Sequence, residues 1–118
     1  MTVLFLDDNK NRRKHARERF RCVSFIETET VTDAIRLLDE SPPFDIVHLD
    51  HDLDGKVFVR SDENSGFWVA KHISEMPIHK RPRVVVIHTH NLDGAKKMFE
   101  VLIGQVTTLI HQPYEVVQ

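Results

Sequence analysis

The sequence has few of the features that mark secreted or membrane-anchored proteins. Its 118 residues include a single cysteine, Cys22, and no apolar run of about 18 residues of the kind that spans a membrane. It also lacks a charged start followed by an apolar leader. One cysteine cannot form an internal disulfide. We therefore expect a soluble, cytoplasmic protein with no membrane partner, in which Cys22 is a small core residue.

An excess of charge of one sign is also absent. The chain has 16 Lys and Arg residues and 18 Asp and Glu residues, and the formal net charge of -2 argues against general nucleic-acid affinity. One basic segment, "KNRRKHARERFR" at residues 10–21, stands out locally. We interpret it as a solvated helix face. Nucleic-acid contact, with salt-sensitive binding and no turnover, is the alternative.

Short apolar runs rich in valine and isoleucine alternate with helix-like segments. The runs lie at residues 2–6, 23–26, 45–49, 83–88 and 106–110. Such runs are typical of strands buried on both faces of a parallel sheet. The length suits one core. The pattern predicts a single α/β domain over residues 1–118, with one doubly wound, five-stranded parallel sheet between two helical layers.

Three of the intervening segments have apolar residues at helical spacing. They lie at residues 30–39, 67–73 and 92–103. The first is expected to have Thr30 or Thr32 as its N-cap, and Pro77 ends the second. Between strand and helix, residues 53–65 form a long polar excursion that we expect to be functional or mobile, with Arg60 as a phosphate clamp or as an ordinary solvated arginine.

Carboxylates follow two of the predicted strands directly. Asp7 and Asp8 come after the first strand, and Asp50 comes after the third. In doubly wound sheets, ligands bind outside the carboxyl ends of the strands, so these side chains converge. Three clustered carboxylates repel one another unless a cation neutralises them, and oxygen ligands favour Mg²⁺ or Mn²⁺. We predict a metal site made by Asp7, Asp8 and Asp50. Their alternative role is to cap helices or turns.

Histidines at the strand ends add groups that exchange protons near neutral pH. His51 and His88 are the predicted proton carriers, with Asp52 orienting a histidine. A purely structural role is the alternative for each of them. A zinc site made by His51, His88 and His90 with an aspartate is the alternative to Mg²⁺ or Mn²⁺.

The remaining polar residues of the fourth strand end have more than one possible role. Thr89 and Asn91 are predicted to hydrogen-bond a phosphate or to orient a histidine, and Asn91 alternatively caps the next helix. His48 lies inside the third strand, on the face opposite to Leu49, and is predicted to be a packing residue.

Asp7, Asp8, Asp50, Thr89 and "QPY" at 112–114 together resemble the receiver domain of response regulators, over nearly the whole chain. The resemblance implies a receiver, flavodoxin-like fold in which the acidic pair binds Mg²⁺. It also implies that Asp50 accepts a phosphoryl group and that Thr89 senses it. Gln112 stands where receivers place a lysine, and the final helix is expected to be short or absent.

A narrower resemblance is to the cyclic-phosphate processing receiver domains. It rests on "LFLDDN" (4–9), "LDHDL" (49–53), "SGFWVAKHI" (65–73) and "HTHNLDGAKKM" (88–98), in which Thr89 replaces a serine and Leu92 a common proline. The resemblance implies metal-dependent hydrolysis of cyclic phosphate ends of RNA or nucleotides. The site residues that we predict for this reaction are Asp50, His51, Asp52, His88, Thr89 and Asn91.

The alternative function is that of a signalling module without catalysis. An atypical receiver, with or without phosphorylation at Asp50, would bind a protein partner or a second copy of itself through the fourth helix and fifth strand. The absence of the receiver lysine at Gln112 disfavours an ordinary phosphorylation switch, and the extra histidines disfavour a purely structural remnant.

Overall fold

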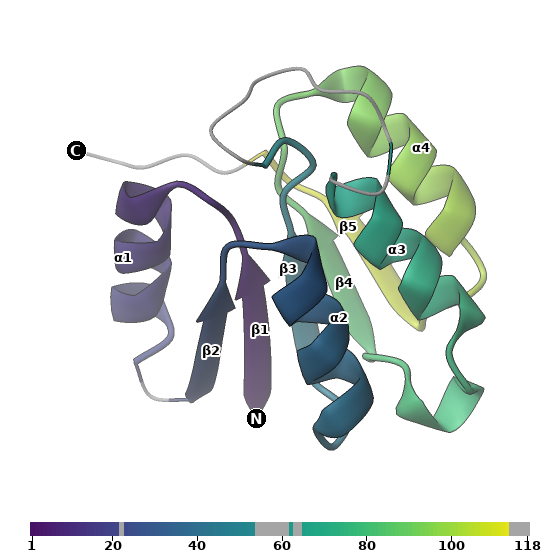
Figure 1. Cartoon of the computed structure of the whole chain (residues 1–118), viewed down its shortest axis with the longest axis horizontal. Coiled ribbons are helices and arrows are strands. Elements are labelled where there is room, and N and C mark those ends of the chain that lie inside the picture. Colours follow the sequence, from purple (N-terminus) through teal and green to yellow (C-terminus); the bar gives the residue numbers. More distant parts are fainter. Residues whose placement is uncertain (22, 54–61, 63–64, 114–118) are drawn as a thin grey trace.

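The computed structural model describes residues 1–21, 23–53, 62 and 65–113, so the predictions for Cys22 and Arg60 lie outside the described residues. Within these residues, five strands alternate with four α-helices (Figure 1). The strands are β1 (Thr2–Leu6), β2 (Ser24–Thr28), β3 (Ile46–Leu49), β4 (Val84–Ile87) and β5 (Thr108–His111). The helices are α1 (Lys10–Arg19), α2 (Val31–Glu40), α3 (Gly66–Glu75) and α4 (Leu92–Leu102), with a short 3-10 helix, η1 (Ile78–Lys80). The predicted α/β fold is confirmed.

The sheet is parallel throughout, with the strand order β2-β1-β3-β4-β5. Its winding direction reverses between β1 and β3, and ligands bind at such a reversal. The register pairs Leu6 with Leu49 and Leu49 with Ile87. The next residue of each of these three strands therefore lies at the same level of the sheet.

Side-chain caps fix the start of the helices that follow the strand ends. The Asn9 side chain accepts a hydrogen bond from the backbone N–H of Arg12 at the start of α1. Asn91 does the same for Gly94 at the start of α4, at 2.9 Å. Thr30, one of the two predicted caps, begins α2. A cap satisfies N–H groups that the helix itself leaves unpaired, so it fixes the residue at which the helix begins. Because both caps follow their strands within a few residues, α1 and α4 start close to the ends of β1 and β4.

The two faces of the sheet carry cores of different size. Leu6, Leu49 and Ile87 belong to a large apolar core beneath α2, α3 and α4, which lie in front of the sheet in Figure 1. Phe5 packs on the other face with Ala16 of α1. No helix of the described residues combines the length and the apolar character that a membrane span requires.

His48 is a packing residue, as predicted, and it lies on the α1 face. Its ring lies 5.5 Å from that of Phe5 and 5.4 Å from that of Phe20, measured between centroids. Within the described part of the chain, its Nδ1 has no hydrogen-bond partner. Burial, and secondarily the neighbouring His88, lower the pKa of His48 from 6.5 to about 3.

Acid is therefore expected to destabilise the fold through His48. Below pH 6.5 the unfolded chain takes up a proton that the folded ring refuses until about pH 3. Stability should fall through this window as the pH decreases, by up to about 1.4 kcal/mol per pH unit. Urea denaturation of the wild type and of His48→Phe, at a series of pH values, measures the slope. The variant keeps an aromatic ring without a titrating group, so an identical slope would contradict this account.

Candidate functional site

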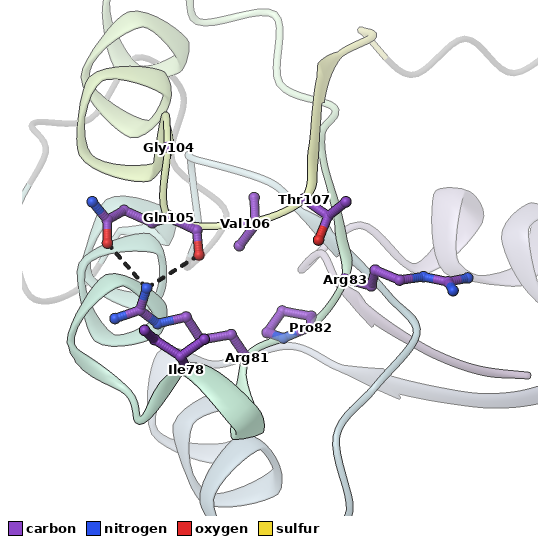
Figure 2. A pocket seen from close by; sticks show the side chains of 8 residues that line it. All are labelled: Ile78, Arg81, Pro82, Arg83, Gly104, Gln105, Val106 and Thr107. Atoms are coloured by element: carbon purple, nitrogen blue, oxygen red, sulfur yellow. Dashed lines mark hydrogen bonds between the residues drawn. The ribbon is translucent and has the colours of Figure 1, made fainter.

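An open hollow of about 490 Å³ lies at the amino-terminal edge of the sheet, between the start of β4 and the loop before β5 (Figure 2). Arg81 lines it and donates to the backbone oxygens of Met76 and Ser74, each at 2.9 Å, and to the side-chain oxygen of Gln105 at 3.0 Å. These bonds connect Arg81 to the end of α3 and to the loop before β5, which is a structural role. The site residues predicted from the sequence lie at the other edge.

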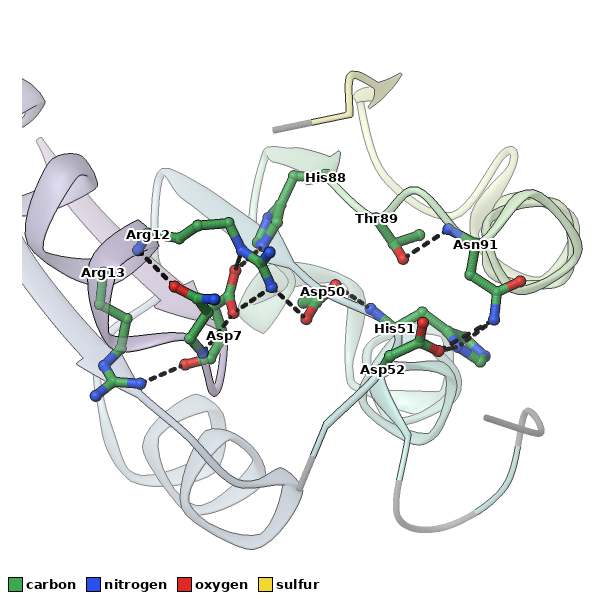
Figure 3. Close-up of polar contacts among 10 residues, drawn as sticks. Asp7, Arg12, Arg13, Asp50, His51, Asp52, His88, Thr89 and Asn91 are labelled. Atoms are coloured by element: carbon green, nitrogen blue, oxygen red, sulfur yellow. Dashed lines mark hydrogen bonds and ion pairs between the residues drawn. The ribbon is translucent and has the colours of Figure 1, made fainter. Parts of the chain in front are cut away.

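At the carboxyl edge, Asp7 is fully buried and accepts several hydrogen bonds. The Arg12 guanidinium donates from Nε to Oδ2 at 2.7 Å and from Nη2 to Oδ1 at 3.0 Å (Figure 3). His88 Nε2 lies 2.9 Å from Oδ2. Burial alone would raise the pKa of Asp7, but the hydrogen bonds from His88 and Arg12 outweigh it and hold that pKa below 3.8. Asp7 is therefore an ionised carboxylate.

Asp50 follows β3 and is only 4% exposed. Its Oδ1 accepts from the backbone N–H of His51 at 3.0 Å, but its Oδ2 has no hydrogen-bond partner in the described structure. The nearest cation to Oδ2 is Arg12 Nη2 at 3.5 Å. Burial, together with the negative charge of Asp7, raises the pKa of Asp50 to about 8. A further positive charge at this point would favour its ionised form.

Asp7, Asp50 and His88 form a group that fits a divalent cation. Each offers one ligand atom, and the three atoms lie within 4.8 Å of one another. The Oδ2 atom of Asp50 supports this fit, because among the described residues it is buried without a hydrogen-bond donor and its nearest cation, Arg12 Nη2, lies 3.5 Å away. Two carboxylates and an imidazole suit Mn²⁺ or Zn²⁺, whereas Mg²⁺ prefers oxygen ligands alone.

The predicted third ligand, Asp8, is half-buried and does not belong to this group. His88 takes that place in the described structure, and the ligand role of Asp8 stays a prediction. Burial lowers the pKa of His88 below 6.5, although Asp7 acts in the opposite direction. The ring is therefore neutral at pH 7, the form in which histidine binds metals.

His51 belongs to a second polar cluster with Asp52 and Asn91. Its ring is fully buried, and Nδ1 lies 2.8 Å from Asp52 Oδ1. Asn91 donates from Nδ2 to the same oxygen at 3.0 Å. Because the carboxylate can only accept, His51 donates to it from Nδ1. The pair points toward α4, away from Asp7, and the orienting role of Asp52 stays a prediction (Figure 3).

Strand alternation explains the two clusters. Side chains two residues apart along a strand share a face, so Asp7 continues the face of Phe5 and Asp50 that of His48. Both lie on the α1 face, with His88 beside them. His51 and Thr89 come one residue later and lie on the opposite side, where α4 supplies Asn91. Spacing alone thus separates the predicted residues.

The zinc alternative with three histidines is not assembled in the described structure. His51 is held in the second cluster by Asp52, and His90 is exposed. The other predicted residues at this edge have structural contacts. The Thr89 hydroxyl accepts from the backbone N–H of Asn91 at 3.1 Å, and Gln112 is exposed, with its backbone N–H bonded to Ile87.

Arg12 and Arg13 are the site residues that the sequence analysis missed. They belong to the segment interpreted as a solvated face, but Arg12 binds Asp7, and the buried Arg13 lies 2.6 Å from Glu29 and 3.0 Å from the backbone oxygen of Asp7. The sequence does contain a pattern that indicates acidic partners for these arginines. Basic residues in the first turn of a helix oppose its dipole, so they need acidic partners nearby, and α1 has none in its own first turn.

Comparison with solved structures shows the receiver fold. A signal receiver domain from Vibrio parahaemolyticus, described as part of a Luxo repressor protein, is 22% identical with a TM-score of 0.64, covering 97% of this chain and 79% of that one. A CheY-like receiver domain from Methylobacillus flagellatus is 15% identical with a TM-score of 0.64, covering 98% and 88%.

A third structure, a response regulator from Burkholderia pseudomallei, contains a phosphorylated aspartic acid, a calcium ion and citrate. It is 14% identical with a TM-score of 0.68, and the match covers 98% of this chain and 61% of that one. No curated protein is significantly similar in sequence.

A family model matches most of the chain and agrees with the receiver fold. It describes the cyclic-phosphate processing receiver domain and matches residues 2–104, which include both polar clusters. The match spans β1 to the end of α4 and so covers most of the chain. The chain therefore belongs to the cyclic-phosphate processing receiver domain family, a branch of the response-regulator type of receiver.

Proposed function

We propose that this chain hydrolyses cyclic phosphate ends of RNA or nucleotides with a divalent cation held by Asp7, Asp50 and His88. The observation that carries the proposal is the Oδ2 atom of Asp50, which is buried without a hydrogen-bond partner beside a carboxylate and an imidazole. A cation there would satisfy this atom and offset the repulsion between Asp50 and Asp7. Mn²⁺ is the cation that we propose, because it accepts both carboxylate and imidazole ligands.

The chain's own residues would bind and orient the reacting groups. The ring of His88 is stacked on Phe5, with centroids 4.8 Å apart and an interplanar angle of 3°, so its orientation is fixed. Asp7 and Asp50 are both buried at the carboxyl edge of the sheet, so their carboxylates are held in place by the surrounding structure. When bound, the cation would polarise a phosphoryl oxygen and lower the pKa of a water molecule.

We propose roles for the two histidines that differ from those expected from the sequence. His51 is 0% and His88 is 2% exposed, so neither ring is placed to exchange protons freely with solvent. We assign His88 to cation binding, and we assign His51 with Asp52 to holding the turn after β3 in place. Ring opening breaks one P–O bond and adds one water, and in this proposal solvent water supplies the proton for the leaving sugar oxygen.

The first test uses a short RNA that ends in a 2′,3′-cyclic phosphate. Incubation with the protein and Mn²⁺ or Mg²⁺ is expected to add the mass of one water to the RNA, and a chelator should stop the reaction. Asp50→Asn and His88→Ala are expected to lower the rate by at least about 100-fold, because each removes a cation ligand.

His79→Ala is the matched control for the histidine variant. His79 is exposed on η1, before β4 begins, and should be dispensable. Failure of the RNA to gain a water with either metal, or equal rates for His88→Ala and the wild type, would refute the assignment of this substrate and site.

A second candidate function is that of a signalling receiver phosphorylated at Asp50. The same unpartnered Oδ2 at the end of β3 favours it, as does the phosphorylated aspartic acid of the Burkholderia structure. Gln112 in place of lysine counts against it. Exposed Ile103 and Ile110, at 62% and 40%, offer a surface for a protein partner or a second copy after α4 and on β5. Acetyl phosphate with Mg²⁺ should then phosphorylate the wild type and leave Asp50→Asn unmodified.

A further inference from the structure

Arg12 reaches from the first turn of α1 into the group that would hold the cation. Its guanidinium forms a two-pronged contact with Asp7, from Nε to Oδ2 and from Nη2 to Oδ1 (Figure 3). The same Nη2 lies 3.5 Å from the Oδ2 atom of Asp50. One positive charge thus bridges both carboxylates of the group.

The contacts of Arg12 use atoms that a metal ion would also need. Asp7 Oδ2 already accepts from Arg12 Nε at 2.7 Å and lies 2.9 Å from His88 Nε2. Binding of a cation by Asp7 and His88 therefore requires that the bond between them be given up. A guanidinium held close to Asp50 Oδ2 repels an incoming cation as well. The arginine and the metal compete for the same place.

Burial shows which partner can move. The side chain of Asp7 is 0% exposed, whereas that of Arg12 is 29% exposed, so only the guanidinium has a short path to water. Arg13 differs, because its side chain is 10% exposed and is held by Glu29 and the backbone oxygen of Asp7. A flexible, partly exposed arginine can leave an ion pair without leaving a buried charge of its own.

We propose that Arg12 is a built-in counter-ion of the acidic group, and that a divalent cation binds Asp7 and Asp50 only by displacing its guanidinium. This inference rests on the proposed cation site and adds its regulation. In the metal-free protein, Arg12 supplies the positive charge that pairs with the buried carboxylate of Asp7 and lies beside Asp50. The apparent metal affinity is lowered by the free energy needed to release this ion pair.

Titration calorimetry with Mn²⁺ alone, on metal-free protein, tests the competition. Arg12→Gln is expected to bind Mn²⁺ at least about 10-fold more tightly than the wild type, since no ion pair has to be broken. Arg12→Lys should also bind more tightly than the wild type. An ammonium keeps the charge but lacks the planar fork that grips both oxygens of Asp7.

Lys10→Gln is the control for net charge, because Lys10 lies exposed in the same turn of α1. A general electrostatic effect predicts that Lys10→Gln gains as much affinity as Arg12→Gln and that Arg12→Lys behaves like the wild type. Either of those results would overturn the proposal, as would equal Mn²⁺ affinity in the wild type and in Arg12→Gln.

Thermal unfolding gives a second readout that needs no substrate. Without metal, Arg12→Gln should melt at a lower temperature than the wild type, because Asp7 loses its cationic partner. Added Mn²⁺ should raise the melting temperature more in the variant than in the wild type. A smaller rise in the variant would contradict displacement.

These measurements separate the inference from the proposed hydrolysis. If Mn²⁺ affinity responds to Arg12 as expected but the RNA gains no water, the competition stands and the hydrolase proposal fails. If neither the wild type nor Arg12→Gln binds Mn²⁺, the inference itself is refuted.

Discussion

Replacing Gly66 with alanine is expected to destabilise the protein by about 3 kcal/mol or more. Gly66 opens α3, and its N–H donates to the backbone oxygen of His51 at 2.9 Å. A Cβ at this position would lie 1.7 Å from the backbone oxygen of Asp50. Since that oxygen belongs to the main chain, no side-chain rotation relieves the clash. Either α3 or the Asp50–His51 peptide must move.

Urea denaturation of Gly66→Ala measures this loss, and Gly104→Ala is the matched control. Gly104 has a φ of 77°, and an added Cβ there meets nothing within 4 Å. Its substitution should cost only the backbone strain of the left-handed conformation, about 1 kcal/mol. Equal losses in the two variants would show that α3 is not closely docked on the turn after β3. Because Asp50 lies in this turn, we also expect Gly66→Ala to weaken Mn²⁺ binding.

Replacing Gly94 with alanine is expected to destabilise the fold by about 2 kcal/mol, although alanine favours helices over glycine by about 1 kcal/mol. A Cβ on Gly94 would lie 2.5 Å from two ring carbons of His51 and 2.7 Å from Nδ1. The absence of a side chain at Gly94 therefore allows the buried imidazole of His51 to pack against α4. It also explains the Gly of the "HTHNLDGAKKM" segment, whose Met98 is a fully buried core residue.

A double-mutant cycle tests this contact. His51→Ala alone should cost about 3 kcal/mol, because it leaves a cavity. In the double variant with Gly94→Ala the clash disappears, because the ring is gone. Its loss in free energy of unfolding should therefore be smaller than the sum of the two single losses by at least about 1 kcal/mol. Lys96→Ala, exposed on the same helix, is the control and should show no such coupling. Strict additivity of Gly94→Ala and His51→Ala would contradict the contact.

The sequence by itself determined the sheet and the meeting of Asp7 and Asp50 at its carboxyl edge. Runs of buried β-branched residues specify strands, and parallel strands must end at a common edge. The caps were also local, since Asn91 was among the predicted helix starts. Strand alternation also predicts that the residues at the strand ends divide into two clusters, because residues two apart along a strand share a face. Past the last residue of each strand, the same rule separates His51 and Thr89 from Asp7 and Asp50.

Tertiary structure decided the remaining contacts. Whether Asp8 or His88 completes the acidic group depends on how the chain turns into α1, and periodicity ends at that turn. Arg12 joined the group because α1 lies on the same face of the sheet and its exposed guanidinium reaches back to Asp7. The docking of Gly66 and Gly94 on the turn after β3 is equally nonlocal. Such contacts depend on the distance between elements that only packing sets, so no local pattern encodes them.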